Sequence, residues 1–118
     1  VENLLTPRQP FTNLHAYWDG LPGRQSLRAE RLERQLSRLL QQYPAPTRGE
    51  PRHWYAESRA ALAGAYPEHD GSLLPVIDTE LDRRARRLAE HRLVAAGYRL
   101  GWLLEEICGA AVPRESSR

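Results

Sequence analysis

The sequence contains no lysine, no methionine and only one cysteine, Cys108. A single cysteine excludes an intrachain disulfide, so the chain must be held together by packing or by contacts with something outside it. A buried, inert thiol is the simpler expectation for Cys108, and pairing with a cysteine of a missing segment is the alternative. No run approaches the roughly 20 apolar residues that a membrane-spanning helix requires.

Because lysine is absent, all 17 basic residues are arginines, and 15 acidic residues leave a formal net charge of +2. Such a small excess gives only weak support for an anionic partner, since solubility explains it equally well. The length, 118 residues, fits one domain with a modest core. The start lacks a signal peptide and an initiator methionine. These features indicate an internal or processed beginning, and we expect a fragment.

Hydrophobic spacing predicts an all-α fold with three main amphipathic helices. The first is expected from Ser26, a suitable cap, to about Gln42. The second is expected over about 52 to 66, with Pro51 in its first turn. The third and longest is expected from Thr79 to about Gly109, because Thr79-Glu80-Leu81-Asp82 resembles a capping box. The expected core stripes are Ala29, Leu32, Leu36, Leu39 and Tyr43 in the first helix, and Ala85, Ala89, Leu93, Ala96, Leu100, Leu103 and Ile107 in the third.

The rest of the chain is expected to be less regular. Residues 1 to 14 predict a short hairpin or an extended loop around two prolines, followed by a helical turn over 14 to 19. Gly97, inside the long helix, predicts the close approach of a neighbouring helix. We place one domain portion at 1–112 and a frayed tail at 113–118.

His15 and Asp19 are four residues apart, so on a helical turn an imidazole and a carboxylate project from the same side and can reach one metal ion. Spacing alone is a weak signal, because such pairs are commonly simple side-chain contacts. The surrounding phrase, Asn13-Leu14-His15-Ala16-Tyr17-Trp18-Asp19, is more specific. It resembles the Asn-Leu-His-x-x-Trp-Asp segment of the mung bean nuclease family, the single-strand-specific zinc nucleases.

Two later segments resemble the same family in the same order. Trp54-Tyr55-Ala56-Glu57-Ser58 is similar to its Trp-x-x-Glu-Ser helix. The segment from Arg92 to Leu100 is similar to the Arg-Leu-x-x-Ala-Gly-x-Arg-Leu stretch of its last long helix. The resemblance thus covers about residues 13 to 104.

The resemblance implies that the chain is the C-terminal part of a larger, helical, phospholipase C/nuclease-like zinc fold. It implies an endonuclease acting on single-stranded DNA or RNA, leaving 5′-phosphorylated products, with 3′-nucleotidase activity besides. Three zinc ions are expected in the full-length protein, and His15 and Asp19 would supply two ligands to one of them. The family's remaining ligands lie in an upstream segment that this sequence does not contain. The fragment alone is therefore expected to be inactive, and secretion or a periplasmic location is implied.

Two alternatives remain at this point. One is a non-catalytic helical interaction or structural module, and the other is a related zinc phospholipase, which the tryptophan-bearing segments favour less. We expect Tyr17 and Trp18 to be packing residues, although tryptophan can also stack on unpaired bases. Glu57 and Ser58 are expected to support the structure. No ligand function is assigned to His53, His69 or His91.

Overall fold

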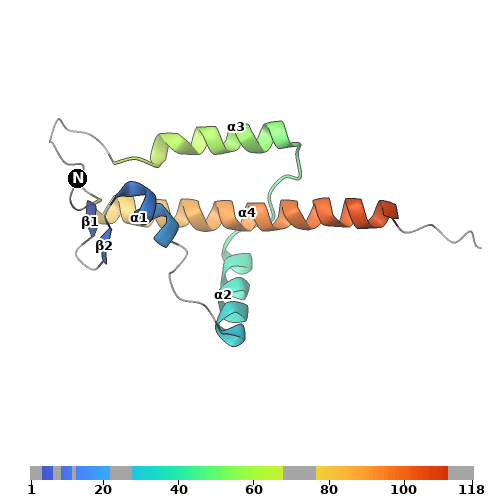
Figure 1. Cartoon of the computed structure of the whole chain (residues 1–118), viewed down its shortest axis with the longest axis horizontal. Helices are drawn as coiled ribbons and strands as arrows, with labels where there is room; N and C mark the ends of the chain where they lie inside the picture. Colours follow the sequence, from blue (N-terminus) through green and yellow to red (C-terminus); the bar gives the residue numbers. More distant parts are fainter. Residues whose placement is uncertain (1–3, 7–8, 12, 22–27, 68–76, 112–118) are drawn as a thin grey trace, which may run out of the picture.

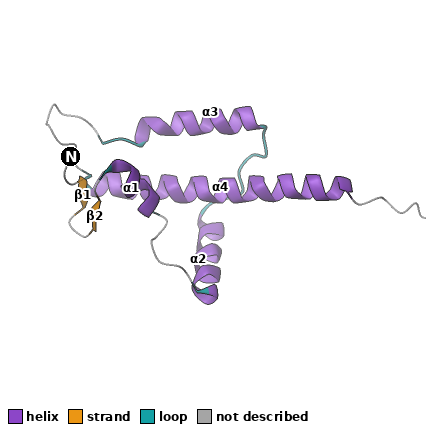
Figure 2. Ribbon diagram, in the orientation of Figure 1, coloured by secondary structure: helices purple, strands orange, loops and turns teal. Residues whose placement is uncertain are grey.

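The computed structural model describes residues 4–6, 9–11, 13–21, 28–67 and 77–111. A two-stranded antiparallel hairpin comes first, with Leu4 opposite Phe11. The remaining elements are helices, so the predicted all-α class is confirmed (Figure 2). In chain order the elements are β1 (Leu4–Thr6), β2 (Gln9–Phe11), α1 (Leu14–Gly20), α2 (Ala29–Gln42), α3 (Pro51–Ala61), the 3₁₀ helix η1 (Leu62–Gly64) and α4 (Thr79–Ala111).

The long helix α4 is the element on which the others assemble (Figure 1). Its 33 residues span about 50 Å at 1.5 Å per residue. Helix α3 runs antiparallel beside it, α2 extends away from its middle, and α1 lies near its first turns. Large side chains on α2 and α4, such as Leu36 and Leu100, are more than half exposed. The described part of the structure is therefore open.

The main core cluster joins α1 to the beginning of α4. Tyr17 is only 1% exposed and Ala85 is fully buried. The Tyr17 hydroxyl donates a hydrogen bond to Oδ1 of Asp82 at 2.9 Å. Burial, and then this bond to a carboxylate, raise the pKa of Tyr17 above its ordinary value. The buried members of this cluster are Tyr17, Leu21, Ile77, Leu81 and Ala85.

A second, smaller cluster fixes the end of α2 against the middle of α4. Leu39 and Tyr43 pack on Val94, and the Tyr43 hydroxyl donates to Glu90 at 2.8 Å. Arg38 donates to the other oxygen of the same carboxylate at 2.6 Å. Only the last turns of α2 are thus anchored, whereas Leu32 and Leu36 are about half exposed.

The predicted core stripes are therefore only partly correct. Ala85 is buried as expected, but most of the later stripe of α4 lies on an exposed face. Hydrophobic periodicity identifies an apolar helix face, but the face becomes a core only where another element covers it. The buried positions beyond the first turns of α4 are instead Val94, Ala95 and Arg99.

Other expectations for α4 also need correction. No other group lies within 4 Å of where a Gly97 β-carbon would be, so the expected close helix contact is absent from the described residues. Cys108 is exposed rather than buried. Both residues lie on turns of α4 where the described part of the chain provides no covering element.

Helix α4 starts at Thr79, as predicted, but its capping residue, the start of α2 and the end of α3 differ from the predictions. Asp78, not Thr79, caps α4, since its side chain accepts from the Leu81 amide at 2.7 Å. The second helix is α-helical only to Ala61 and continues as η1 to Gly64. The described part of helix α2 begins at Ala29. The predicted cap Ser26 lies outside the described residues, and so do His69 and the tail 113–118. Pro51 occupies the first turn of α3 as predicted.

We expect Tyr17→Phe to lower the free energy of unfolding by about 1 kcal/mol, because it removes the hydrogen bond to Asp82 while keeping the buried ring. Urea denaturation followed by circular dichroism measures the change. Tyr55→Phe is the matched control, since Tyr55 is 63% exposed on α3. Equal midpoints for the two variants would contradict the importance of the Tyr17 hydroxyl.

Candidate functional site

Helix α1 presents the two predicted metal ligands to solvent. Its start is fixed by Asn13, whose side-chain oxygen accepts a hydrogen bond from the Ala16 amide at 2.8 Å. This is an N-cap, which satisfies one of the amides left unpaired at a helix start. The cap allows a helix of only seven residues to carry His15 and Asp19 on one face.

Two consecutive side chains hold α1 against the rest of the molecule. The Tyr17 ring is buried against α4, as described above. The Trp18 indole N–H donates to the carbonyl of Ala65, just after η1, at 3.2 Å. The two rings meet edge to face with centroids 6.1 Å apart. Both residues therefore act as packing anchors, as expected from the sequence.

The His15 and Asp19 side chains lie side by side, with Nε2 and Oδ2 3.1 Å apart. They are 87% and 70% exposed, respectively. Two ligands on one tetrahedral zinc ion, with bonds of about 2.0 to 2.2 Å, are about 3.3 Å apart. The separation of these two atoms is therefore close to that of two ligands on one zinc ion, and it is also that of a direct contact between the two side chains.

The described residues contain no group of three or more histidine, cysteine, aspartate or glutamate side chains placed to hold a metal. His53 is used locally, since its Nδ1 accepts from the Glu50 amide at 3.2 Å in the capping box of α3. His91 is exposed on α4, with its ring 6.0 Å from that of Tyr43. Neither lies in a ligand cluster with His15.

The other two segments that resemble the zinc-nuclease family are residues 54–58 on α3 and 92–100 on α4, and they contact each other. Glu57 accepts hydrogen bonds from Arg92 at 3.0 Å and from Arg99 at 2.9 Å. Arg92 also donates to the Ser58 hydroxyl at 2.6 Å, and that hydroxyl donates to the Trp54 carbonyl at 2.9 Å. Glu57 and Ser58 therefore join the two helices, which agrees with the structural function expected for them.

Arg99 is the most deeply placed charge of this network, at 5% exposure. Its guanidinium lies 5.3 Å from the centroid of the Trp54 ring, an arrangement that attracts a cation to the ring face. Among the residues that the structure describes, the Arg99 Nε is buried without a hydrogen-bond partner. The Trp54 indole N–H is itself held by the Arg48 carbonyl at 2.6 Å.

Hydrogen bonds from Arg99 and then Arg92 lower the pKa of the Glu57 carboxyl below its ordinary value. Glu57 is therefore an ionised structural group at neutral pH, not an acid or base poised near pH 7. Glu90 behaves similarly, because its bond from Arg38 lowers the pKa of that carboxyl.

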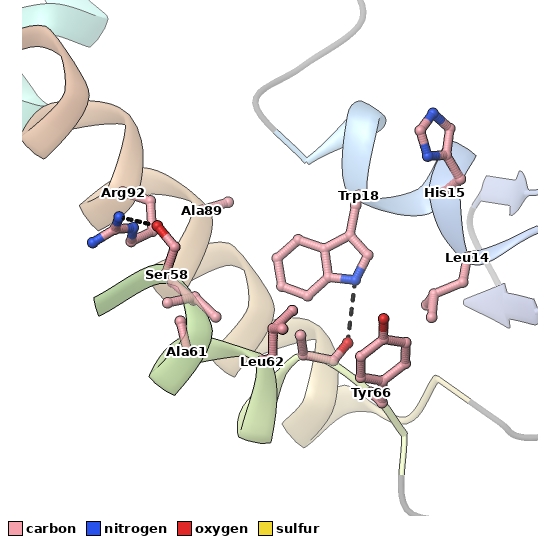
Figure 3. A pocket seen from close by; sticks show the side chains of 11 residues that line it. Leu14, His15, Trp18, Ser58, Ala61, Leu62, Tyr66, Ala89 and Arg92 are labelled. Atoms are coloured by element: carbon pink, nitrogen blue, oxygen red, sulfur yellow. Dashed lines mark hydrogen bonds between the residues drawn. The ribbon is translucent and has the colours of Figure 1, made fainter. Parts of the chain in front are cut away.

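A pocket of about 610 Å³ lies between α1, α3 and α4, with His15 at its edge (Figure 3). Its walls are largely apolar and include Trp18 and Leu62, while Ser58 and Arg92 supply polar atoms. The sequence did not predict this pocket, because its lining comes from three elements far apart in the chain. The only signal was that all three family-like segments contain residues that now line it.

Comparison of the chain with family models, curated proteins and solved structures finds no significant match. Among the described helices, none combines the length and the apolar character needed to cross a bilayer.

We expect Glu57→Gln to destabilise the chain by about 1 kcal/mol at pH 7, since an amide cannot replace a carboxylate shared by two guanidinium groups. The pKa of Glu57 is lower in the folded chain than in the unfolded chain. Its ionisation therefore stabilises the fold at pH values above the unfolded pKa of about 4.3. This stabilisation is lost as the pH falls through the pKa of the folded chain.

The difference in unfolding midpoint between the wild-type chain and Glu57→Gln should therefore shrink below about pH 4. Chemical denaturation between pH 3 and pH 7, about the range in which glutamates titrate, measures it. Glu105→Gln, on an exposed turn of α4, is the control and should show no such trend. A difference for Glu57→Gln that stays constant with pH would contradict the assignment.

Proposed function

We propose that this chain is the C-terminal part of a zinc-dependent nuclease that cleaves single-stranded DNA or RNA to 5′-phosphorylated products, with 3′-nucleotidase activity besides. His15 and Asp19 provide two ligands to one zinc ion. An upstream segment, in the same protein or in a separate chain, provides the remaining ligands. By the same resemblance, the protein is secreted or periplasmic.

The observation that carries the proposal is that some residues of segment 13 to 19 have a structural function, whereas His15 and Asp19 do not need one to be explained. Asn13 caps α1, Leu14 packs beside the core cluster, and Trp18 bonds to the Ala65 carbonyl. These three residues have clear folding functions. His15 and Asp19 are highly exposed and contact each other, an exposed pairing that stabilises a helix by only about 0.2 to 0.5 kcal/mol. Folding therefore explains the rest of the motif better than it explains this pair.

The second support comes from the contact between the other two segments. Glu57 and Ser58 of one segment bind Arg92 and Arg99 of the other directly. Residues that match a family pattern in sequence thus form one interaction unit in space. Two members of this unit, Ser58 and Arg92, also line the pocket next to His15.

Chemically, this chain contributes ligands and their orientation. Zinc, when bound, would supply an acidified water and stabilise the charge that develops on the phosphate. A catalytic zinc normally takes three protein ligands, and His15 and Asp19 are two, so the chain alone should be inactive. The pair should bind zinc only weakly until the other ligands are present.

The decisive experiment uses the protein extended to its natural start. We expect His15→Ala and Asp19→Asn each to remove about one bound zinc ion, because each deletes a direct ligand. Each variant should also lower nuclease activity on single-stranded DNA by at least about 100-fold, beyond the effect typical of outer-shell changes. Zinc is measured by elemental analysis and activity by release of 5′-phosphorylated products.

His91→Ala is the matched control, since His91 is an exposed histidine on α4, and it should retain zinc and activity. An extended protein that binds no zinc would overturn the nuclease assignment. Full zinc content in both ligand variants would overturn the assignment of His15 and Asp19.

A second candidate function, a non-catalytic interaction module, is favoured by the apolar face of α4. Large side chains from its middle to its last turns are 40% to 65% exposed. Such contiguous exposed apolar surface marks an interaction site. The exposed residues are Leu93, Leu100, Leu103, Leu104 and Ile107. Both candidates require this face to be covered, but only the nuclease requires zinc.

Gly97→Ala tests whether this face is covered by a closely packed element. In the 118-residue chain we expect it to raise the free energy of unfolding by about 0.5 to 1 kcal/mol, because alanine favours the helix and meets open space. In the extended protein or a complex, the added methyl group should instead destabilise the packing. Urea denaturation of both forms makes the comparison, and a gain of equal size in both would show that Gly97 stays open.

A further inference from the structure

From its middle to its last turns, α4 carries an apolar stripe that no element of the described chain covers (Figure 1). Its residues recur at alternating intervals of four and three, which is the seven-residue repeat of helices that pair side by side. The large side chains of the stripe are 51% to 65% exposed. We call this stripe the α4 seam, and its residues are Leu93, Gly97, Leu100, Leu104 and Ile107.

The α4 seam contains a hole at Gly97. Among the described residues, no other group lies within 4 Å of where its β-carbon would be, and Gly101, one turn further on, is equally open. Both glycines line a groove of about 500 Å³ between α4 and α2, with Leu36 and Leu40 on the α2 side. The seam therefore combines projecting side chains with a hole that a side chain of a partner helix can fill.

The order of large and small residues makes the α4 seam complementary to itself in the antiparallel direction. In a parallel pair each position faces its own copy, so Gly97 faces Gly97 and leaves a cavity, which is destabilising. In an antiparallel pair with Leu100 opposite Leu104, the same spacing places Ile107 opposite Gly97 at both ends. The most exposed side chain of the seam, Ile107, then fills the hole.

Charge does not oppose this pairing. The positions beside a coiled-coil seam carry charges where charge selects the partner. Here these positions are occupied by Val94, Ala96, Gly101, Leu103 and Cys108. None is charged, so two copies do not repel each other there.

The exposed area also suffices for a pair. The leucines and the isoleucine that α4 and the groove side of α2 leave exposed present roughly 600 Å² on each copy, and a biological interface needs about 1,000 Å² in total. A pair of seams therefore reaches the size of a stable interface.

We infer that the α4 seam is the interface of an antiparallel dimer of this chain, with Ile107 of each copy seated on Gly97 of the other. The inference does not rest on the proposed zinc function, because α1 lies near the first turns of α4, away from the seam (Figure 1). Pairing therefore leaves His15 and Asp19 of both copies accessible.

Sedimentation equilibrium of the 118-residue chain at micromolar concentrations should show a dimer. Leu104→Glu should raise its dissociation constant by at least about 30-fold, the effect of losing a hot-spot residue, because it places a charge in the middle of the interface. Gly97→Leu should also raise it, by filling the hole. Leucine favours a helix more than glycine does, so unfolding does not explain that loss, and circular dichroism checks the helix content.

Leu62→Glu is the matched control, since Leu62 has nearly the same exposure as Leu104 but lies on η1. It should dimerise like the wild-type chain. At concentrations below the dissociation constant the chain is a monomer, and the gain in stability expected for Gly97→Ala refers to this form.

Disulfide crosslinking tests the orientation, in chains whose own cysteine is removed by Cys108→Ser. On oxidation, a mixture of Gly97→Cys and Ile107→Cys chains should crosslink. Ile107→Cys alone should not, because its two copies lie about 15 Å apart along the axis of an antiparallel pair, beyond the Cα separation of about 7 Å that a disulfide spans. Efficient crosslinking of Ile107→Cys alone shows a parallel pair and overturns the inference.

A chain that stays monomeric overturns the inference, and so does a dimer that Leu104→Glu leaves intact. The extended protein distinguishes a second copy from an upstream segment as the occupant of the seam. A dimer of the extended protein that Leu104→Glu dissociates supports the second copy, whereas a monomer assigns the seam to the upstream segment and overturns the inference. Zinc content, measured on the same samples, tests the nuclease proposal separately.

Discussion

The structure depends on the carboxylate of Glu57 and the two arginines that share it. Helix α3 has no fully buried residue, so apolar packing alone does not hold it beside α4. Its attachment comes from Arg92 and Arg99, which bind Glu57. This charge network therefore helps to position α3 and the following Ala65 carbonyl, which accepts the hydrogen bond of Trp18. The ion pairs between α3 and α4 thus also influence the position of α1, which carries the candidate zinc ligands.

The exclusive use of arginine suits this architecture. Each guanidinium presents several N–H groups in a fixed plane, so one side chain can bridge acceptors on different elements. Arg92 reaches both Glu57 and Ser58, and Arg38 reaches Gln42 of its own helix and Glu90 of α4. A lysine ammonium is a compact point charge and does not offer this planar fork. An open fold with small apolar clusters can therefore be linked by a few side chains at its surface.

Local features were predictable from the sequence, and features that depend on distant partners were not. Hydrophobic spacing identified the helices, and Pro51 marked the start of α3. The four-residue interval between His15 and Asp19 correctly brought their side chains together. The sequence did not distinguish Asp78 from Thr79 as the cap of α4, because both side chains are able to cap a helix. The structure shows that Asp78 is the cap. Periodicity did not reveal that the face containing Leu100 is uncovered, since burial depends on what packs there. The pocket is lined by α1, α3 and α4, which are far apart in the chain, so no local sequence pattern predicts it.

Helix α1 is too short to be stable by itself, yet it is clamped by two adjacent side chains. Tyr17 is bound to α4, whereas Trp18 is bound to the chain that follows η1. Successive residues of a helix point about 100° apart, so the two attachments act in different directions and block rotation about the helix axis. The direction in which α1 presents His15 and Asp19 is therefore fixed before any ligand binds. His15 and Asp19 need to lose only side-chain freedom on binding, which reduces the entropic cost of ordering them.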